Sequence, residues 1–236
     1  MDAVIADALS AHRPDDNPYF VALDDGSFSK DDFLETQIQF YFAVIFFSRP
    51  MAAVAAKIPD AALRLEVVRN VWEEHGEGNA SIAHGATFSE LLSRLGGIGQ
   101  ADIARRALWP EVRAFNTALV GAAVLDEHTV SVGMMGMIER MFVDISARLG
   151  RGIVARGWLE ESRMIHYALH EELDVKHAED FFAILRPTWS ARPADRYYVE
   201  QGIRLGAYVF DRLYRDLHRA RARRAFVDDR GPHTRA

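Results

Sequence analysis

Residues 166–182 read HYALHEELDVKHAEDFF, a stretch in which histidines and acids recur at helical spacing. At about 100° per residue, His170, Asp174 and His177 fall within a sector of roughly 60° on one helix face. Three side chains of types that bind metal ions therefore share one face. A polar outer face, with the histidines hydrogen-bonded to Asp174, explains the same spacing, so this stretch alone leaves both interpretations open.

Apolar residues continue at helical spacing through almost the whole chain of 236 residues. Runs of β-branched residues bounded by turn signals, which indicate strands, do not stand out. The sequence therefore predicts an all-α fold, with one helical domain over 1–226 and a flexible tail over 227–236. Pro50 is expected to break or kink the second helix. Helices are expected over residues 3–11, 29–45, 51–57, 60–74, 81–95, 101–125, 127–149, 159–185 and 194–224.

Composition excludes several kinds of site and location. The chain is 49% hydrophobic and 26% charged, which is typical of a soluble globular protein. It has no cysteine, so thiol nucleophiles, iron–sulfur clusters and cysteine-bound zinc are excluded, and His, Asp and Glu remain as metal ligands. The first residues are acidic where an export signal is basic, and the most apolar stretches, 40–47 and 130–138, are shorter than the roughly 18 residues of a membrane helix. We expect a cytoplasmic protein that binds neither membranes nor, at a net charge of -6, nucleic acid.

A second group of acids and histidines lies in residues 70–84, NVWEEHGEGNASIAH. Glu77 and His84 are seven residues apart and share a face if the helix is continuous. Glu74 and His84 converge only if the glycines interrupt the helix. An exposed acidic helix end is the competing interpretation of this segment. Spacing alone therefore leaves Glu73, Glu74 and Glu77 as alternatives for a ligand.

The third group is a single carboxylate, Glu139, within the apolar residues 130–143, VSVGMMGMIERMFV. A carboxylate in such surroundings is either paired, here with Arg140, or bound to a cation. With Glu139 included, three separate helices provide glutamate, aspartate and histidine side chains. That mixture is typical of dinuclear iron or manganese centres. The three groups together favour a metal site.

These segments resemble the haem-oxygenase-like diiron oxidases and oxygenases, relatives of the TenA-type thiaminases and of the oxidase that completes pyrroloquinoline quinone. The resemblance covers about residues 17–182 and includes NPYF at 17–20, Asn70-x-x-Glu73-Glu74-x-Gly76, Glu139 and His170-x-x-x-Asp174-x-x-His177. It implies a haem-oxygenase-like bundle of about seven to nine helices that binds two Fe²⁺ ions and uses O2 as co-substrate. Glu74 is preferred because the family places this ligand just before an x-Gly pair. The ligands implied are Glu74, His84, Glu139, His170, Asp174 and His177.

The resemblance also implies an O2-dependent oxidoreductase of specialised metabolism that acts on a small amino-acid-like or amine substrate. The metal ligands are its only expected catalytic residues. The expected substrate contacts are Arg49, Tyr41 and Met135, and Arg49 is chosen because a guanidinium pairs with a carboxylate. A fatty-acid oxidative decarboxylase of the same family is one alternative. A cofactorless TenA-like or quinone-forming enzyme is the other.

Two further expectations concern the walls of the site and the assembly of the protein. Aromatic residues in 33–47 and 197–214 exceed what one core needs, which predicts a homodimer. Glycines at two positions of the helix near Glu139, Gly133 and Gly136, are expected to leave space for a substrate. The expected apolar walls are Phe40, Phe47, Met134, Met135 and Met137.

Overall fold

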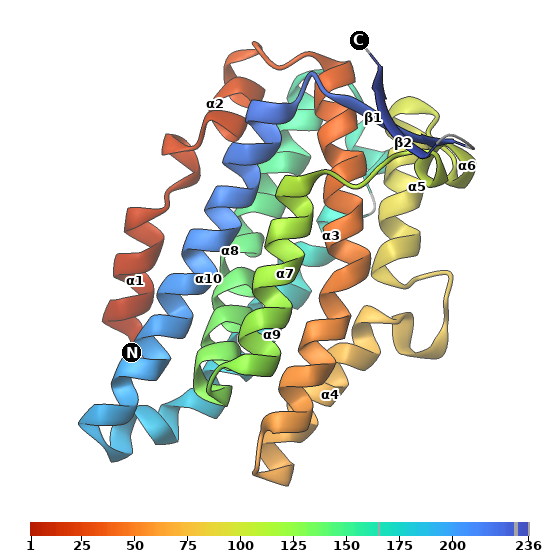
Figure 1. Ribbon diagram of the computed structural model, residues 1–236. Helices are drawn as coiled ribbons and strands as arrows, with labels where there is room; N and C mark the ends of the chain where they lie inside the picture. Colours follow the sequence, from red (N-terminus) through yellow and green to blue (C-terminus); the bar gives the residue numbers. More distant parts are fainter. Residues whose placement is uncertain (165, 229–230, 236) are drawn as a thin grey trace.

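The computed structural model describes the backbone of residues 1–164, 166–228 and 231–235, and the side chains of these residues except 168–174, 228 and 231–235. The described residues form ten α-helices and one antiparallel pair of short strands (Figure 1). The predicted all-α class is therefore confirmed. The helices are α1 (Asp2–Ala11), α2 (Pro18–Asp25), α3 (Lys30–Lys57), α4 (Ala61–Glu74), α5 (His84–Gly96), α6 (Gln100–Ala104), α7 (Pro110–Leu125), α8 (His128–Ala155), α9 (His166–Ala191) and α10 (Pro193–Ala220).

Helices α2 and α7 both begin at a proline, and the predicted helices included neither start. Asn17 caps α2 by accepting a hydrogen bond from the Tyr19 amide at 3.0 Å, and Pro18 occupies the first helical position. Pro110 likewise starts α7, so the single helix expected over 101–125 is divided into α6 and α7. Both differences have one cause, since proline is well suited to the first turn of a helix and unfavourable inside one.

Helix α3 continues through Pro50, so of the break or kink predicted there the break is wrong, and the kink stays a prediction. Pro50 is buried, as are Met51 and Val54 in the turn after it. Burial of this apolar turn offsets the loss of one backbone hydrogen bond at proline. Helix α3 is therefore continuous from Lys30 to Lys57.

By length and composition α3 is apolar enough to cross a membrane, since one 18-residue window has a mean hydropathy of 1.4. The prediction from residues 40–47 alone underestimated this stretch. Half of the window is buried inside the protein. A core helix of a soluble bundle has the same properties, and α3 packs against α4, α5 and α7 in this way.

Helix α8 lies at the centre of the bundle, between α9 and α10 (Figure 1). Gly202 and Gly206 of α10 face the backbone of α8. A Cβ atom on Gly202 would overlap the Val130 carbonyl oxygen, and one on Gly206 would overlap the Met134 carbonyl oxygen. Gly133 of α8 also faces α10. A Cβ atom added to Gly133 would lie 3.1 Å from the amide nitrogen of Ile203. These glycines allow two helices to pack closely.

The C-terminal end forms a hairpin of β1 (Arg224–Asp228) and β2 (Gly231–Arg235), in which Phe226 pairs with His233. Strand β1 also hydrogen-bonds the segment before α7, since the Ala107 amide donates to the Ala225 carbonyl at 2.9 Å. The described residues of the segment 227–236, for which a flexible tail was expected, thus belong to two short strands. The hairpin lies where α3 begins (Figure 1).

Candidate metal centre

A cavity of about 50 Å³ lies inside the bundle. Its walls are mainly aromatic and aliphatic side chains of α3, α7, α8 and α10, namely Phe40, Ala43, Val44, Phe47, Phe115, Ile138, Phe142 and Phe210. Four polar side chains complete the lining, namely Glu74, His84, Glu139 and His166. Acids and imidazoles thus meet in one small and otherwise apolar space.

The turn between α4 and α5 brings Glu74 and His84 together. Gly76, Glu77 and Gly78 have φ angles of 69°, 52° and 87°, so the chain leaves the helix at three successive residues. Glycine adopts this left-handed region easily, whereas glutamate adopts it rarely. The Nδ1 atom of His84 lies 2.8 Å from Oε1 of Glu74. The glycines therefore interrupt the helix, which is the condition under which these two residues were expected to converge.

Glu74, Glu139 and His177 form the centre of the candidate site. One potential ligand atom of each lies within 4.8 Å of the others, although the residues come from α4, α8 and α9. Glu139 is only 4% exposed. Arg140, its sequence neighbour, forms an ion pair with Asp144 at 3.1 Å. The structure thus directs Glu139 toward the acid and histidine cluster and Arg140 toward another partner.

The three competing acids of the α4 to α5 segment have different places. Glu74 lines the cavity, Glu77 is exposed in the turn, and Oε2 of Glu73 lies 2.6 Å from Nε2 of the fully buried His177. A carboxylate on one imidazole nitrogen fixes the orientation of the ring and directs the other nitrogen to a different partner. Glu73 is therefore placed to hold His177, a role that the sequence spacing did not reveal.

His166 and Thr87 also belong to the site. His166 is fully buried and lines the cavity, and its Nδ1 atom lies 2.9 Å from the Thr87 hydroxyl. The spacing within residues 166–182 favoured His170, Asp174 and His177 and did not select His166. A single threonine gives no comparable signal, so Thr87 was missed.

The three predicted substrate contacts do not line the cavity, and two predicted ligands fall outside the described side chains. The side chains of His170 and Asp174 are outside the described part of the chain. Arg49 is exposed, with its guanidinium carbon 5.4 Å from the centre of the Phe46 ring. Tyr41 and Met135 are buried in the core but do not line the cavity.

Helix phase explains why the expected wall residues were only partly correct. On α3 the cavity receives Phe40, Ala43, Val44 and Phe47, whose i, i+3, i+4, i+7 spacing excludes the neighbouring Tyr41. On α8 it receives Ile138, Glu139 and Phe142, and the expected methionines, Met134, Met135 and Met137, pack in the core instead. Gly136 leaves no substrate space, because Phe181 and Phe182 of α9 fill the position in front of it.

The described donor atoms fit a divalent transition-metal ion. Oxygen and nitrogen ligands of such an ion lie at roughly 2.0–2.2 Å from it, so opposite ligand atoms are separated by roughly 4.0–4.4 Å. The spacing within 4.8 Å of Glu74, Glu139 and His177 is close to this limit. Two carboxylates this close together in a largely apolar space are stabilised by a cation between them.

The chain was compared with known protein families and structures. A family model described as iron-containing redox enzyme matches residues 34–211. No curated protein has a significant sequence match to the chain.

Three similar solved structures cover most of the chain. A domain of unknown function with a haem-oxygenase-like fold from Shewanella denitrificans has a TM-score of 0.70 and 15% identity, over 92% of this chain and 88% of that one. A CADD-like protein of unknown function from Nostoc punctiforme has a TM-score of 0.73 and 12% identity, over 91% and 96%. A TenA homologue from Pseudomonas syringae pv. tomato has a TM-score of 0.73 and 18% identity, over 91% and 90%. These similarities confirm the haem-oxygenase-like fold.

Proposed function

Since the chain belongs to the family of iron-containing redox enzymes, we propose that it is a non-haem dinuclear iron enzyme that uses O2 to oxidise a small substrate. The observation that carries this proposal is the buried cluster of Glu74, Glu139 and His177, with potential ligand atoms within 4.8 Å of one another. A buried set of two carboxylates and an imidazole is a typical iron-binding set. Its position beside a cavity provides space for O2 and a substrate group.

In this proposal Glu74, Glu139, His177 and the adjacent His84 hold iron, and His170 and Asp174 complete the two-ion set. Bound Fe²⁺ ions supply the redox chemistry that activates O2. The protein supplies the geometry. Glu73 holds the His177 ring through their 2.6 Å contact, and the phenylalanines of the wall surround the cavity with apolar side chains.

The cavity wall supports a substrate with an apolar body. Its eight apolar residues include five phenylalanines, and Lys and Arg are absent from the described lining. An amino-acid-like substrate held by Arg49 is less well supported, since Arg49 lies outside the cavity. We therefore propose an amine with an apolar side chain as the first substrate class. Apolar walls also suit the alkyl chain of a fatty acid in chemical character, so oxidative decarboxylation is the second candidate.

Metal analysis tests the proposed function and separates it from a cofactorless TenA-like enzyme. Protein loaded with Fe²⁺ under argon and desalted is expected to retain about two irons per chain and to consume O2 when exposed to air. Glu74→Gln should lose iron, whereas the matched change Glu77→Gln, at an exposed acid of the same segment, should retain it. Retention of iron and of O2 uptake by a Glu74→Gln, Glu139→Gln double variant would contradict the proposal.

The homodimer expected from the sequence remains a proposal, with one surface feature in its favour. An apolar groove between α3 and α7 is lined by Phe46, Leu108, Val120, Val124 and Leu125 among others. Leu125 is 86% exposed and Val124 57%, and exposed apolar surface of this kind is often covered by a partner. Sedimentation velocity at micromolar concentration tests the dimer without reference to the chemistry.

A further inference from the structure

The groove beside α3 and α7, two helices that lie side by side (Figure 1), has a volume of about 500 Å³. It is separate from the internal cavity, because adjacent residues on each helix face the two spaces. On α3, Phe47 lines the cavity and Phe46 lines the groove. On α7, Phe115 lines the cavity and Asn116 lines the groove. A groove of this volume is within the range of small-molecule binding sites.

Asn116 gives this groove a buried hydrogen-bond acceptor. The residue is only 8% exposed, and its Oδ1 atom has no hydrogen-bond partner in the described part of the chain. Buried side-chain oxygens are in most cases hydrogen-bonded, because an unpaired acceptor in an apolar place is destabilising. A ligand that brings an N–H or O–H donor into the groove satisfies this atom.

Arg113 lies one turn before Asn116 on the same face of α7 and also lines the groove. Its guanidinium pairs with no acid among the residues that the structure describes. Glu111, the only acid of α7, instead forms two hydrogen bonds with Arg223, and residues 36–57 of α3 contain no acid. A guanidinium binds a carboxylate strongly through two parallel hydrogen bonds. The groove therefore offers an anion site beside the Asn116 acceptor.

Gly121 leaves open space in the apolar part of the groove. It lies inside α7, where a glycine is destabilising relative to alanine. A Cβ atom added at Gly121 would meet no other atom within 4 Å, so close packing does not require a glycine here. The neighbouring Val120 also lines the groove and is 38% exposed. This part of the groove thus has room for an apolar chain.

We propose that the groove binds an N-acyl amino acid, whose carboxylate pairs with Arg113 and whose amide N–H donates to Oδ1 of Asn116. One carbon separates these two groups in such a molecule, and side chains three residues apart on a helix are neighbours in the same way. The acyl chain lies along Val120 and Gly121. A free amino acid suits the site less well, because the described lining contains no Asp or Glu to pair with its ammonium group.

This binding site does not depend on the proposed iron chemistry. It also leaves Leu125 free for the proposed dimer, since Leu125 lies about 14 Å beyond Asn116 along α7 at 1.5 Å per residue. The ligand and the dimer therefore concern different ends of the groove.

Three matched probes test the inference by isothermal titration calorimetry under argon. N-octanoylglycine has the carboxylate, the amide and the chain, its methyl ester lacks the charge, and undecanoate has a chain of equal length without the amide. We expect the wild-type protein to bind N-octanoylglycine about tenfold or more tightly than either analogue. Absence of N-octanoylglycine binding, or equal affinity for undecanoate, would overturn the inference.

Substitutions of the two polar residues should each remove one preference. Arg113→Gln should weaken N-octanoylglycine binding to the level of the ester, and Asn116→Leu should weaken it to the level of undecanoate. Arg151→Gln, at an exposed arginine of α8 outside the described lining, is the matched control and should bind as the wild type does. Asn116→Leu should not lower the urea midpoint of unfolding, because it removes a buried acceptor that has no partner. Unchanged binding in Arg113→Gln or in Asn116→Leu would refute the assignment.

Gly121→Leu tests the place of the acyl chain without changing a polar contact. It should fold normally, since the added side chain meets open space, and should weaken N-octanoylglycine binding by about tenfold or more. Wild-type affinity in this variant would contradict the proposed place of the chain.

Two further measurements separate this site from the metal centre and from the dimer. Iron(II)-loaded and metal-free protein should bind N-octanoylglycine equally, so failure of the proposed function leaves this test intact. Binding that requires iron would place the ligand in the metal centre and overturn the inference. Sedimentation velocity should show the same assembly with and without N-octanoylglycine. Conversion of a dimer to a monomer by the ligand would mean that a second copy of the chain occupies this end of the groove, and would likewise overturn it.

Discussion

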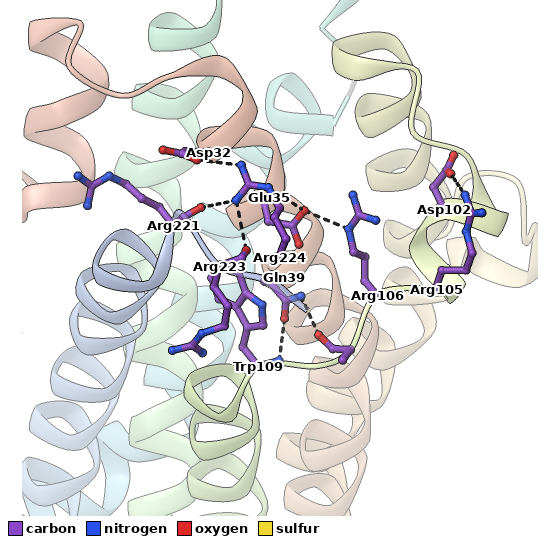
Figure 2. Close-up of polar contacts among 11 residues, drawn as sticks. Asp32, Glu35, Gln39, Asp102, Arg105, Arg106, Trp109, Arg221, Arg223 and Arg224 are labelled. Carbon is purple, nitrogen blue, oxygen red and sulfur yellow. Dashed lines mark hydrogen bonds and ion pairs between the residues drawn. The ribbon is translucent and has the colours of Figure 1, made fainter. Parts of the chain in front are cut away.

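Two buried carboxylates, Glu35 and Glu139, have opposite surroundings. Glu35 of α3 is 2% exposed and lies beside two guanidinium groups, with Arg106 at 3.0 Å and Arg224 at 3.9 Å (Figure 2). Glu139 of α8 is 4% exposed and shares its space with a second carboxylate and an imidazole. A guanidinium neutralises a buried carboxylate permanently, whereas an acid and imidazole cluster accepts an exchangeable cation. Burial of an acid is therefore not by itself evidence for a metal site. The groups around the acid must also be known.

The Glu35 region attaches the C-terminal hairpin to the bundle (Figure 2). Arg224 of β1 contacts Asp32 at 2.8 Å, and Gln39 joins the Ala107 carbonyl and the Trp109 amide at 3.0 and 2.9 Å. The neighbouring Arg223 forms two hydrogen bonds with Glu111 of α7. Two arginines near the C-terminus, Arg223 and Arg224, thus pair with acids of α7 and α3.

The largest expected effect compares the same substitution at the two acids. Glu139→Gln should abolish iron retention, because an amide is a far poorer ligand than a carboxylate and leaves positive charge in an apolar space. Glu35→Gln should retain the wild-type iron content. Metal analysis after anaerobic loading measures both variants side by side. Equal iron content in the Glu139→Gln and Glu35→Gln variants would contradict the proposal that Glu139 binds iron and Glu35 does not.

The second effect concerns folding stability. Arg106→Ala removes a guanidinium from the buried Glu35 and should lower the free energy of unfolding by on the order of 3 kcal/mol. Arg105→Ala, at the adjacent position, removes an exposed pair with Asp102 and should cost less than about 1 kcal/mol. Urea unfolding followed by circular dichroism gives both values. A cost for Arg106→Ala as small as that for Arg105→Ala would show that Glu35 does not depend on its partner.

The third effect is a pH dependence of stability. Burial raises the pKa of Glu35 above its ordinary value, and the charges of Arg106 and Arg224 offset this only in part. The folded protein therefore binds the Glu35 proton more tightly than the unfolded chain does. This contribution is fully present below the unfolded pKa of 4.5 and is lost as the pH rises through the higher folded pKa.

The free energies of unfolding of the wild type and of Glu35→Gln, measured at about pH 4 and about pH 7, test the direction of this pH dependence. The wild type should lose stability relative to the variant as the pH rises. A gain over the same interval would mean that the arginines outweigh burial. Glu35 would then behave as an ordinary salt-bridged acid.

The long helices and the family were predictable from sequence because they depend on patterns that extend over many residues. The helical period of α8 and the spacing of the histidines on α9 are examples. The spacing of the acids did not decide between Glu74 and Glu77, and only the family resemblance favoured Glu74, because the difference depends on three backbone angles at residues 76–78. Tyr41, an expected substrate contact, does not line the cavity that its neighbour Phe40 lines, because one position on a helix rotates a side chain by about 100°. Sequence patterns thus indicated which residue types come together. Local backbone geometry and helix phase determined which individual residues do so.

Arg49 is the charged residue for which we expect the smallest effect. It is exposed, and its contact with the Phe46 ring at 5.4 Å is of a kind that contributes about 0.5–1 kcal/mol at an exposed site. Arg49→Ala should therefore lower the free energy of unfolding by less than about 1 kcal/mol and leave the iron content unchanged. Urea unfolding and metal analysis on this one variant measure the two quantities. A loss of iron as large as that of Glu139→Gln would contradict the placement of Arg49 outside the site, and the cavity wall would then have to include a cation that the described lining lacks.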